Sequence, residues 1–195
     1  MNSAVLLLLV LDFALITMLP RLFFLRTGTF NLRWWSTALP VGLSPVLAVV
    51  CRLLDVRPVV PTGWLPGTGL AAVVFFAGSI ALVTLTIGTH RVPIALWHQS
   101  DDDPQHIVTW GTYRRIRHPF YTAFLLAFAG AALAFPHWYT FALLIYMATM
   151  LNTLAAREER KLSTSEFGAQ YQEYMTRTGR FLPRWAQPAE QEATI

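Results

Sequence analysis

The side chains best suited to chemistry gather in one short stretch of the sequence, GTYRRIRHPFY. Its Arg117 and His118 can donate hydrogen bonds to a negatively charged group. Tyr113 and Tyr121 offer aromatic faces that can hold an adenine ring or a cationic sulfonium. Pro119 is the residue type favoured at the first position of a helix, where unpaired backbone N–H groups attract anions. The stretch therefore predicts a binding site at a helix start, although such residues could also serve only to anchor a helix at a membrane surface.

The composition of the chain places this stretch in a membrane protein. Of the 195 residues, 54% are hydrophobic and only 13% are charged, whereas a soluble domain has roughly 45–50% apolar and about 25% charged residues. The formal charge of +4 comes from arginines that flank apolar runs, so it indicates membrane orientation and no nucleic-acid partner. Because Cys51 is the single cysteine, no disulfide or cysteine-based metal site can form within one chain. The carboxylates of Asp101, Asp102 and Asp103 are more simply a solvated turn than a cation site, and we expect no metal.

Five apolar runs approach the roughly 17–25 residues that a membrane-spanning helix requires. They cover residues 3–19, 38–54, 65–87, 120–135 and 138–156. Only Pro136 and His137 separate the last two runs, which predicts a tight antiparallel hairpin. Further on, Phe167, Tyr171 and Tyr174 are spaced as on one face of a helix. We therefore predict an all-α, polytopic membrane bundle of about five transmembrane helices with a cytoplasmic C-terminal helix.

We expect a single integral membrane domain over residues 1–195. Residues 1–90 form its N-terminal three-helix part, residues 111–183 carry the motif, and residues 186–195 form a tail that is predicted to be disordered. Asp12 lies within the first apolar run, where a charge is costly. We expect Asp12 to face the bundle and to pair helices rather than to act in catalysis.

A longer pattern extends from the first stretch towards the C-terminus. GxYxxxRHPxY is followed by a short helical hairpin, by the acidic pair Glu158 and Glu159, and then by FGAQYQEYMTRTGRFLP. This order and spacing resemble the family of isoprenylcysteine carboxyl methyltransferases and phospholipid methyltransferases. The chain departs from the family pattern at Thr122 and Ala123, where a small residue and then glycine are common. The interval from Glu159 to Phe167 is also slightly longer, so both glutamates stay candidates.

The resemblance implies a methyltransferase whose cofactor is S-adenosylmethionine. It assigns cofactor binding to these positions: Tyr113, Arg117, His118, Pro119, Tyr121, Glu158 and Glu159. A carboxylate there would hold the ammonium group or the ribose hydroxyls of the cofactor, and a surface pair with the neighbouring basic residues is the alternative. Arg177 and Arg180 are the candidate catalytic residues that orient an anionic acceptor. Anchoring to anionic lipid headgroups is the alternative for these two arginines.

The expected methyl acceptor is a lipophilic molecule, isoprenylcysteine carboxylate-like or phospholipid-like, that comes from the bilayer to the cytoplasmic interface. An apolar entry between helices is expected beside Phe120, Phe124, Leu125 and Phe128. Membrane lipids are the other expected partners. The sequence does not indicate an oligomeric state.

Two other classes of protein remain open at this stage. Membrane sterol reductases share an arginine-histidine and tyrosine motif and use NADPH, but they usually have asparagine before the tyrosine, where this chain has Phe120. A small transporter or assembly protein could use the same hairpin, although the spans lack paired charges for an ion path.

The basic residues predict the orientation of the chain. In the five-span arrangement, 13 of the 15 lysines and arginines fall on one side and only Arg52 and Arg57 on the other. The positive-inside rule then places the N-terminus outside and the C-terminus in the cytoplasm, in the plasma or inner membrane of a bacterium or the endoplasmic reticulum of a eukaryote.

A reporter that is active only in the cytoplasm tests this orientation. It should be active when fused to the C-terminus and inactive when fused after Pro61. An inactive C-terminal fusion, or an active fusion after Pro61, would reject the five-span arrangement.

Overall fold

The computed structural model describes residues 3–18, 29–89 and 107–184. Within these ranges the chain forms α-helices and two short 3-10 turns, and it contains no strand. The helices are α1 (Ser3–Thr17), α2 (Leu32–Leu53), α3 (Leu65–Thr89), α4 (Pro119–Ala134), α5 (Trp138–Ser163) and α6 (Gly168–Arg177). The prediction of an all-α helical bundle is confirmed. Asp101, Asp102, Asp103 and the predicted tail lie outside the described residues.

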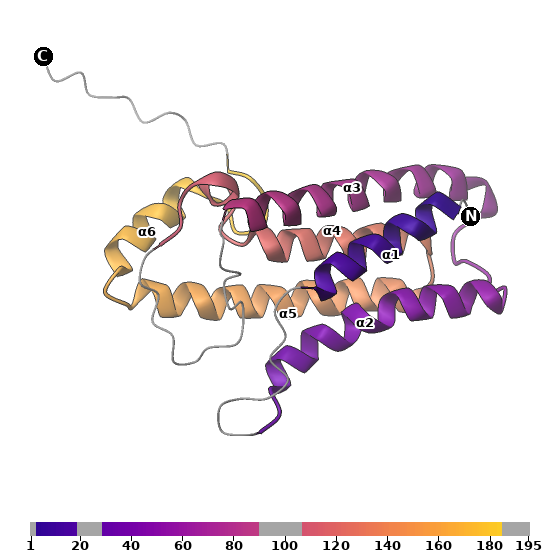
Figure 1. The fold of residues 1–195 in the computed structure, drawn as a ribbon, viewed down its shortest axis with the longest axis horizontal. Helices are drawn as coiled ribbons and strands as arrows, with labels where there is room; N and C mark the ends of the chain where they lie inside the picture. Colours follow the sequence, from indigo (N-terminus) through magenta and orange to yellow (C-terminus); the bar gives the residue numbers. More distant parts are fainter. Residues whose placement is uncertain (1–2, 19–28, 90–106, 185–195) are drawn as a thin grey trace, which may run out of the picture.

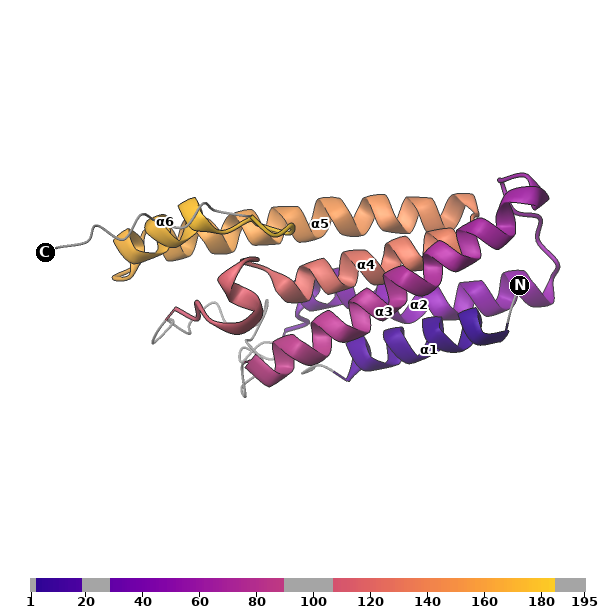
Figure 2. The same cartoon turned by 90° about the horizontal axis from the view of Figure 1, so that it is seen from above.

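Helices α1 to α5 run along the long axis of the molecule, and α6 lies at one end, beside the last turns of α5 (Figure 1). The view from above shows α5 on one side, α4 and α3 next to it, and α1 and α2 on the other side (Figure 2). Helix α4 contacts α1, α3 and α5. It is therefore the central element of the bundle.

Helix α4 is buried along nearly all of its length. The rings of Phe120, Phe124 and Phe128 are each 2% exposed or less, and the small residues between them let the neighbouring helices approach. Phe128 packs edge-to-face on Phe13 of α1, with ring centroids 5.1 Å apart. These three phenylalanines are packed against the neighbouring helices, whereas Leu125, the fourth residue of the expected entry for the acceptor, is half-buried. The entry stays a prediction.

A polar contact joins three helices inside the bundle. Asp12 of α1 is fully buried, and the hydroxyl oxygen of Ser79 in α3 lies 2.8 Å from its Oδ1 atom. The same hydroxyl lies 2.9 Å from the backbone oxygen of Ala123 in α4. Asp12 thus faces the bundle and pairs helices, as the cost of a charge in hydrocarbon predicts.

Three of the described helical segments are long and apolar enough to cross a membrane: Trp34–Leu53, Thr62–Thr89 and Trp138–Ser163. Helices α1 and α4 are apolar but have only 15 and 16 residues. At about 1.5 Å per residue, such helices rise less than the roughly 30 Å thickness of the hydrocarbon core. The count of five spans stays a prediction.

The connection between α4 and α5 is the predicted tight hairpin. Thr140 accepts a hydrogen bond from the backbone N–H of His137 and donates to the backbone oxygen of Phe135, at 3.2 and 2.6 Å. These bonds close the turn and start α5. Because the two helices are antiparallel, the beginning of α4 lies beside the last part of α5. The hairpin therefore brings His118 and Tyr121 close to the acidic pair.

The close packing of α3 on α4 can be tested at Gly130. A Cβ atom there would lie 2.8 Å from the buried ring of Phe76, whereas a Cβ at Gly78 of α3 would lie at an ordinary 3.7 Å from Leu126. Replacing either glycine by alanine stabilises its helix by up to about 1 kcal/mol, because alanine has the higher helix propensity. Overpacking should lower the free energy of unfolding of Gly130→Ala by about 1–3 kcal/mol relative to that of Gly78→Ala. Thermal unfolding in detergent measures the difference, and equal melting temperatures would contradict the packing.

Candidate active site

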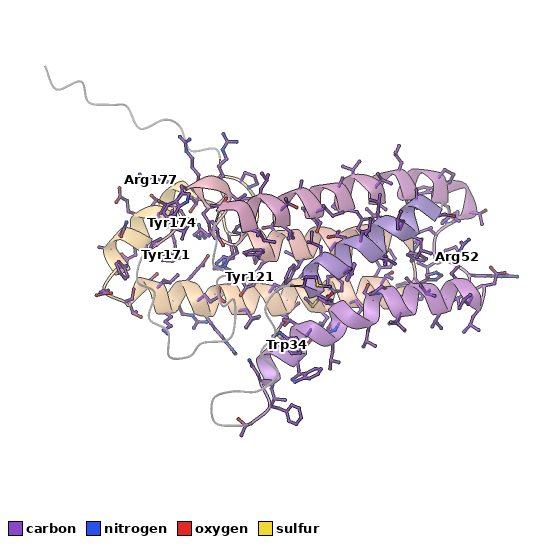
Figure 3. All side chains as sticks on the ribbon, in the orientation of Figure 1. Trp34, Arg52, Tyr121, Tyr171, Tyr174 and Arg177 are labelled. Atoms are coloured by element: carbon purple, nitrogen blue, oxygen red, sulfur yellow. The ribbon has the colours of Figure 1, made fainter. Side chains whose placement is uncertain are left out.

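The motif, the acidic pair and the chain after α6 meet at one end of the bundle. Figure 3 shows Tyr121 between α4 and α5, towards the end that carries Tyr171 and Tyr174 of α6, whereas Arg52 lies at the opposite end. Tyr121, Tyr171 and Tyr174 are all buried. The site is therefore enclosed by α4, α5 and α6, beyond the apolar part of α5 that ends near Ala156.

A short parallel pairing holds the motif against the C-terminal segment. Gly179 donates a backbone hydrogen bond to Arg115 at 3.1 Å and accepts one from Arg117 at 2.8 Å, and the backbone N–H of His118 donates to Arg180 at 3.1 Å. A Cβ atom at Gly179 would collide with the backbone oxygen of Leu182. Glycine is thus required for the chain to turn here.

Gly111 plays a similar part at the start of the motif. Its φ angle is 61°, in the left-handed region that favours glycine, and a Cβ atom there would collide with the side chain of Thr89 at the end of α3. Tyr113, two residues later, is buried, and its backbone oxygen accepts a hydrogen bond of 2.6 Å from the Tyr174 hydroxyl. Burial raises the pKa of the Tyr113 hydroxyl above its ordinary value. The motif is therefore fixed to both α3 and α6.

Glu159 is the charged centre of the site. Its carboxylate accepts hydrogen bonds from the guanidinium groups of Arg117, at 2.9 Å, and Arg180, and its side chain is 8% exposed. Burial alone would raise the pKa of Glu159, but the nearby side chains of His118, Arg180 and Arg117 outweigh this effect and hold the pKa well below its usual range. Arg117 also donates to the backbone oxygens of Met175 and Thr178 at the end of α6. Glu159 therefore joins α4, α5 and the segment after α6.

Glu158, the next residue, has different surroundings. Its Oε1 atom accepts a hydrogen bond of 2.6 Å from the Tyr121 hydroxyl, its Oε2 atom lies 3.5 Å from Nδ1 of His118, and its side chain is 33% exposed. No arginine or lysine of the described residues forms an ion pair with it. Burial raises the pKa of Glu158 to about 8, and the negative charge of Glu159 adds to the rise, while the Tyr121 bond opposes it. The carboxyl group of Glu158 is thus not committed to a cation.

His118 lies between the two glutamates. Its ring is stacked on that of Tyr121, with centroids 5.2 Å apart and an angle of 4° between the planes. Its Nε2 atom lies 3.4 Å from Glu159 Oε1, and it is buried without a hydrogen bond to the described residues. Burial lowers the pKa of His118 below 6.5 despite the influence of Glu159. The imidazole is therefore neutral at pH 7.

The structure brings most of the predicted residues together, with one exception. Pro119 occupies the first turn of α4, as predicted. Arg180 reaches the site and binds Glu159. Arg177 does not reach it, because its side chain is exposed on α6 and forms an ion pair with Glu173 one helical turn earlier. Figure 3 shows Arg177 on the outer side of α6.

Sequence reasoning missed several neighbours of the site. Asn152 accepts a hydrogen bond of 2.8 Å from Arg180, and the ring of Phe181 lies 6.2 Å from that of His118. The backbone oxygen of Phe181 also accepts a hydrogen bond of 2.9 Å from Thr122. Asn152 could have been found, because it interrupts an apolar run and precedes Glu159 by two helical turns. Nothing in the sequence indicates the position of Phe181.

The apolar helical bundle is the architecture of a helical integral membrane protein. A family description for phospholipid methyltransferases matches residues 67–170, which is more than half of the chain. The chain belongs to this family and is a membrane methyltransferase. The matched residues include the motif and both glutamates but neither Arg177 nor Arg180. No curated protein and no solved structure matches the chain.

Two acids of the region, the buried Glu159 and the exposed Glu173, provide a matched test of the site. Removing one partner of a buried pair typically costs about 3–5 kcal/mol, so Glu159→Gln should strongly destabilise the protein. Glu173→Gln removes the exposed pair with Arg177 and should cost at most about 1 kcal/mol. Denaturant unfolding in detergent compares the two variants. Equal losses of stability would show that Glu159 does not hold the site together.

Proposed function

We propose that this methyltransferase transfers a methyl group from S-adenosylmethionine to a lipophilic acceptor at the cytoplasmic face of the membrane. The proposal rests chiefly on Glu158, a half-buried carboxyl group without an arginine or lysine partner among the described residues. It lies beside a neutral imidazole and an aromatic ring, at the end of an apolar bundle. The family membership of the chain supports methyl transfer over the sterol reductase and transporter alternatives.

The residues of the site fit the cofactor chemically. S-adenosylmethionine carries a sulfonium, an ammonium and ribose hydroxyls, and a carboxylate binds the last two through charge-assisted hydrogen bonds. Glu158 can supply this carboxylate once it is ionised. The buried Nε2 atom of His118 offers a further hydrogen-bonding group, and the face of Tyr121 suits a cationic sulfonium. We infer that Glu158, His118 and Tyr121 contact the cofactor.

Arg117 and Glu159 have a different role in this proposal. The resemblance assigns both to cofactor binding, but their charges are engaged with each other and with Arg180. We infer that they position His118 and the C-terminal segment around the cofactor. Arg180 also binds Glu159, but its side chain is 33% exposed, so it is the better of the two candidate arginines for orienting the acceptor. Arg177 is more suited to anionic lipid headgroups, since its side chain is exposed.

When bound, S-adenosylmethionine would supply a methyl group activated by the positive sulfur, and the acceptor atom would bond to the methyl carbon as the carbon–sulfur bond breaks in line with it. The protein then contributes mainly by orienting the acceptor and by excluding water. An acceptor carboxylate needs no general base, whereas an amine or hydroxyl must lose a proton. His118 can take up that proton at a ring nitrogen, because burial keeps the imidazole neutral near pH 7.

Isothermal titration of the detergent-solubilised protein tests the cofactor site. Glu158→Gln should weaken S-adenosylmethionine binding roughly ten- to hundredfold, because losing a charge-assisted hydrogen bond costs about 1.5–3 kcal/mol. Glu166→Gln, which changes an exposed acid between α5 and α6, should leave the affinity unchanged. NADPH should not bind. A wild-type protein that binds no S-adenosylmethionine at millimolar concentration would refute the proposal.

A further inference from the structure

A fully buried acid lies where α1, α3 and α4 meet, outside the cluster of charges at the candidate active site. Asp12 of α1 has no exposed surface, and neither has its neighbour Ser79 of α3. Helix α1 contacts both α3 and α4 and lies beside α3 in the view from above (Figure 2). The mechanism proposed above uses neither residue, so this buried polar contact needs a role of its own.

The contact contains two short distances between oxygen atoms. Ser79 Oγ lies 2.8 Å from Asp12 Oδ1 and 2.9 Å from the backbone oxygen of Ala123. Each hydrogen bond requires a proton between its two oxygens, and a serine hydroxyl carries one proton whereas a backbone carbonyl carries none. If both contacts are full hydrogen bonds, the second proton must therefore belong to the carboxyl group of Asp12. With an ionised Asp12, one of the two contacts would bring lone pairs face to face.

The surroundings of Asp12 also favour a neutral acid. Helices α1, α3 and α4 contain no lysine, arginine or histidine, and the basic residues of α2 are Arg33 and Arg52, close to its two ends. Asp12 forms no ion pair with the described residues, and its Oδ2 atom is buried without a hydrogen-bond partner among them. A buried carboxylate in these surroundings would be costly. A neutral acid leaves only an uncharged carbonyl oxygen without a partner, which costs less.

The contact holds the part of α4 that carries residues of the candidate active site. Ala123 follows Tyr121 by two residues. Between them, Thr122 donates a hydrogen bond of 2.9 Å to the backbone oxygen of Phe181, in the segment after α6. The first turns of α4 are therefore held to α3 through Ser79 and to the C-terminal segment through Thr122.

We propose that Asp12 is a neutral carboxylic acid whose hydroxyl donates to Ser79, so that Ser79 can donate to Ala123. This chain of hydrogen bonds fixes α4 to α3 at one height and so sets the position of Tyr121 relative to Glu158. Ser79 is thus a positioning residue, and the proton on Asp12 leaves the proton of Ser79 free for α4. The positioning role rests on the proposed function, whereas the protonation of Asp12 does not.

Infrared difference spectroscopy of the full chain in detergent tests the protonation of Asp12. Glu158→Gln is the reference sample, because Glu158, with its pKa of about 8, is a second acid expected to be protonated at pH 7. Adding Asp12→Asn should remove the C=O absorption of one protonated carboxyl group and leave the carboxylate bands unchanged. Adding Ser79→Ala instead should shift that absorption, because the acid loses its hydrogen-bond partner. Loss of a carboxylate band with Asp12→Asn, or an unshifted spectrum with Ser79→Ala, would overturn the neutral acid.

Titration with S-adenosylmethionine, well below the melting temperature of each variant, tests the positioning role. Ser79→Ala should weaken cofactor binding about tenfold, equivalent to roughly 1.4 kcal/mol. Asp12→Asn should keep the wild-type affinity, because its amide N–H can donate to Ser79 in place of the acid. The matched control is Thr86→Val. Thr86 is also fully buried on α3, but its hydroxyl donates to Leu82 of the same helix, so its loss should leave the affinity unchanged.

The remaining outcomes separate the two proposals. Equal affinities of Ser79→Ala and Thr86→Val for the cofactor would overturn the positioning role. Ser79→Cys retains a weaker donor and should bind with an intermediate affinity, which keeps the test open if Ser79→Ala does not fold. A wild-type protein that binds no S-adenosylmethionine refutes the proposed function, and the positioning role with it, whereas the infrared result on Asp12 stands. Cofactor binding together with an ionised Asp12 overturns only the neutral acid.

Discussion

The pairing of Glu159 with Arg117 and Arg180 is the interaction on which the rest of the site depends. A carboxylate that is 8% exposed would be unstable alone, and the two guanidinium groups make its burial tolerable. The three residues come from the motif just before α4, the end of α5 and the segment after α6. Separating these residues would leave a buried charge without its partner, which is strongly destabilising. The three parts of the chain are therefore held in one arrangement. The backbone pairing around Gly179 joins the same motif to the same C-terminal segment.

Two adjacent acids have opposite surroundings because successive residues of a helix point about 100° apart. Glu159 points to the arginines and stays ionised, whereas Glu158 points to Tyr121 and His118, and its pKa rises to about 8. The negative charge of Glu159 contributes to that rise. The ionised Glu159 holds the surrounding segments together through its arginines. Glu158 leaves a second carboxyl group for a cationic ligand. This division of roles is the physical basis of the proposed cofactor site.

The membrane part of the fold serves this site by placing a short, fully packed helix at its centre. Helix α4 fills its surroundings with phenylalanine and small residues, and Asp12 and Ser79 add a polar contact to its neighbours. A groove instead lies between α2 and α5, which touch through Tyr146 and Ser36.

The sequence by itself determined the helical membrane bundle, the hairpin and the family, because hydropathy, turn residues and motif spacing are local properties of the chain. It also predicted that Pro119 begins a helix. It could not decide which glutamate is committed to arginines, or that Arg180 reaches the site while Arg177 stays outside. Those outcomes depend on where the chain returns after α6, and so on contacts between residues far apart in sequence. Only the tertiary structure decides them, because helix rotation and the pairing at Gly179 set which side chains face each other.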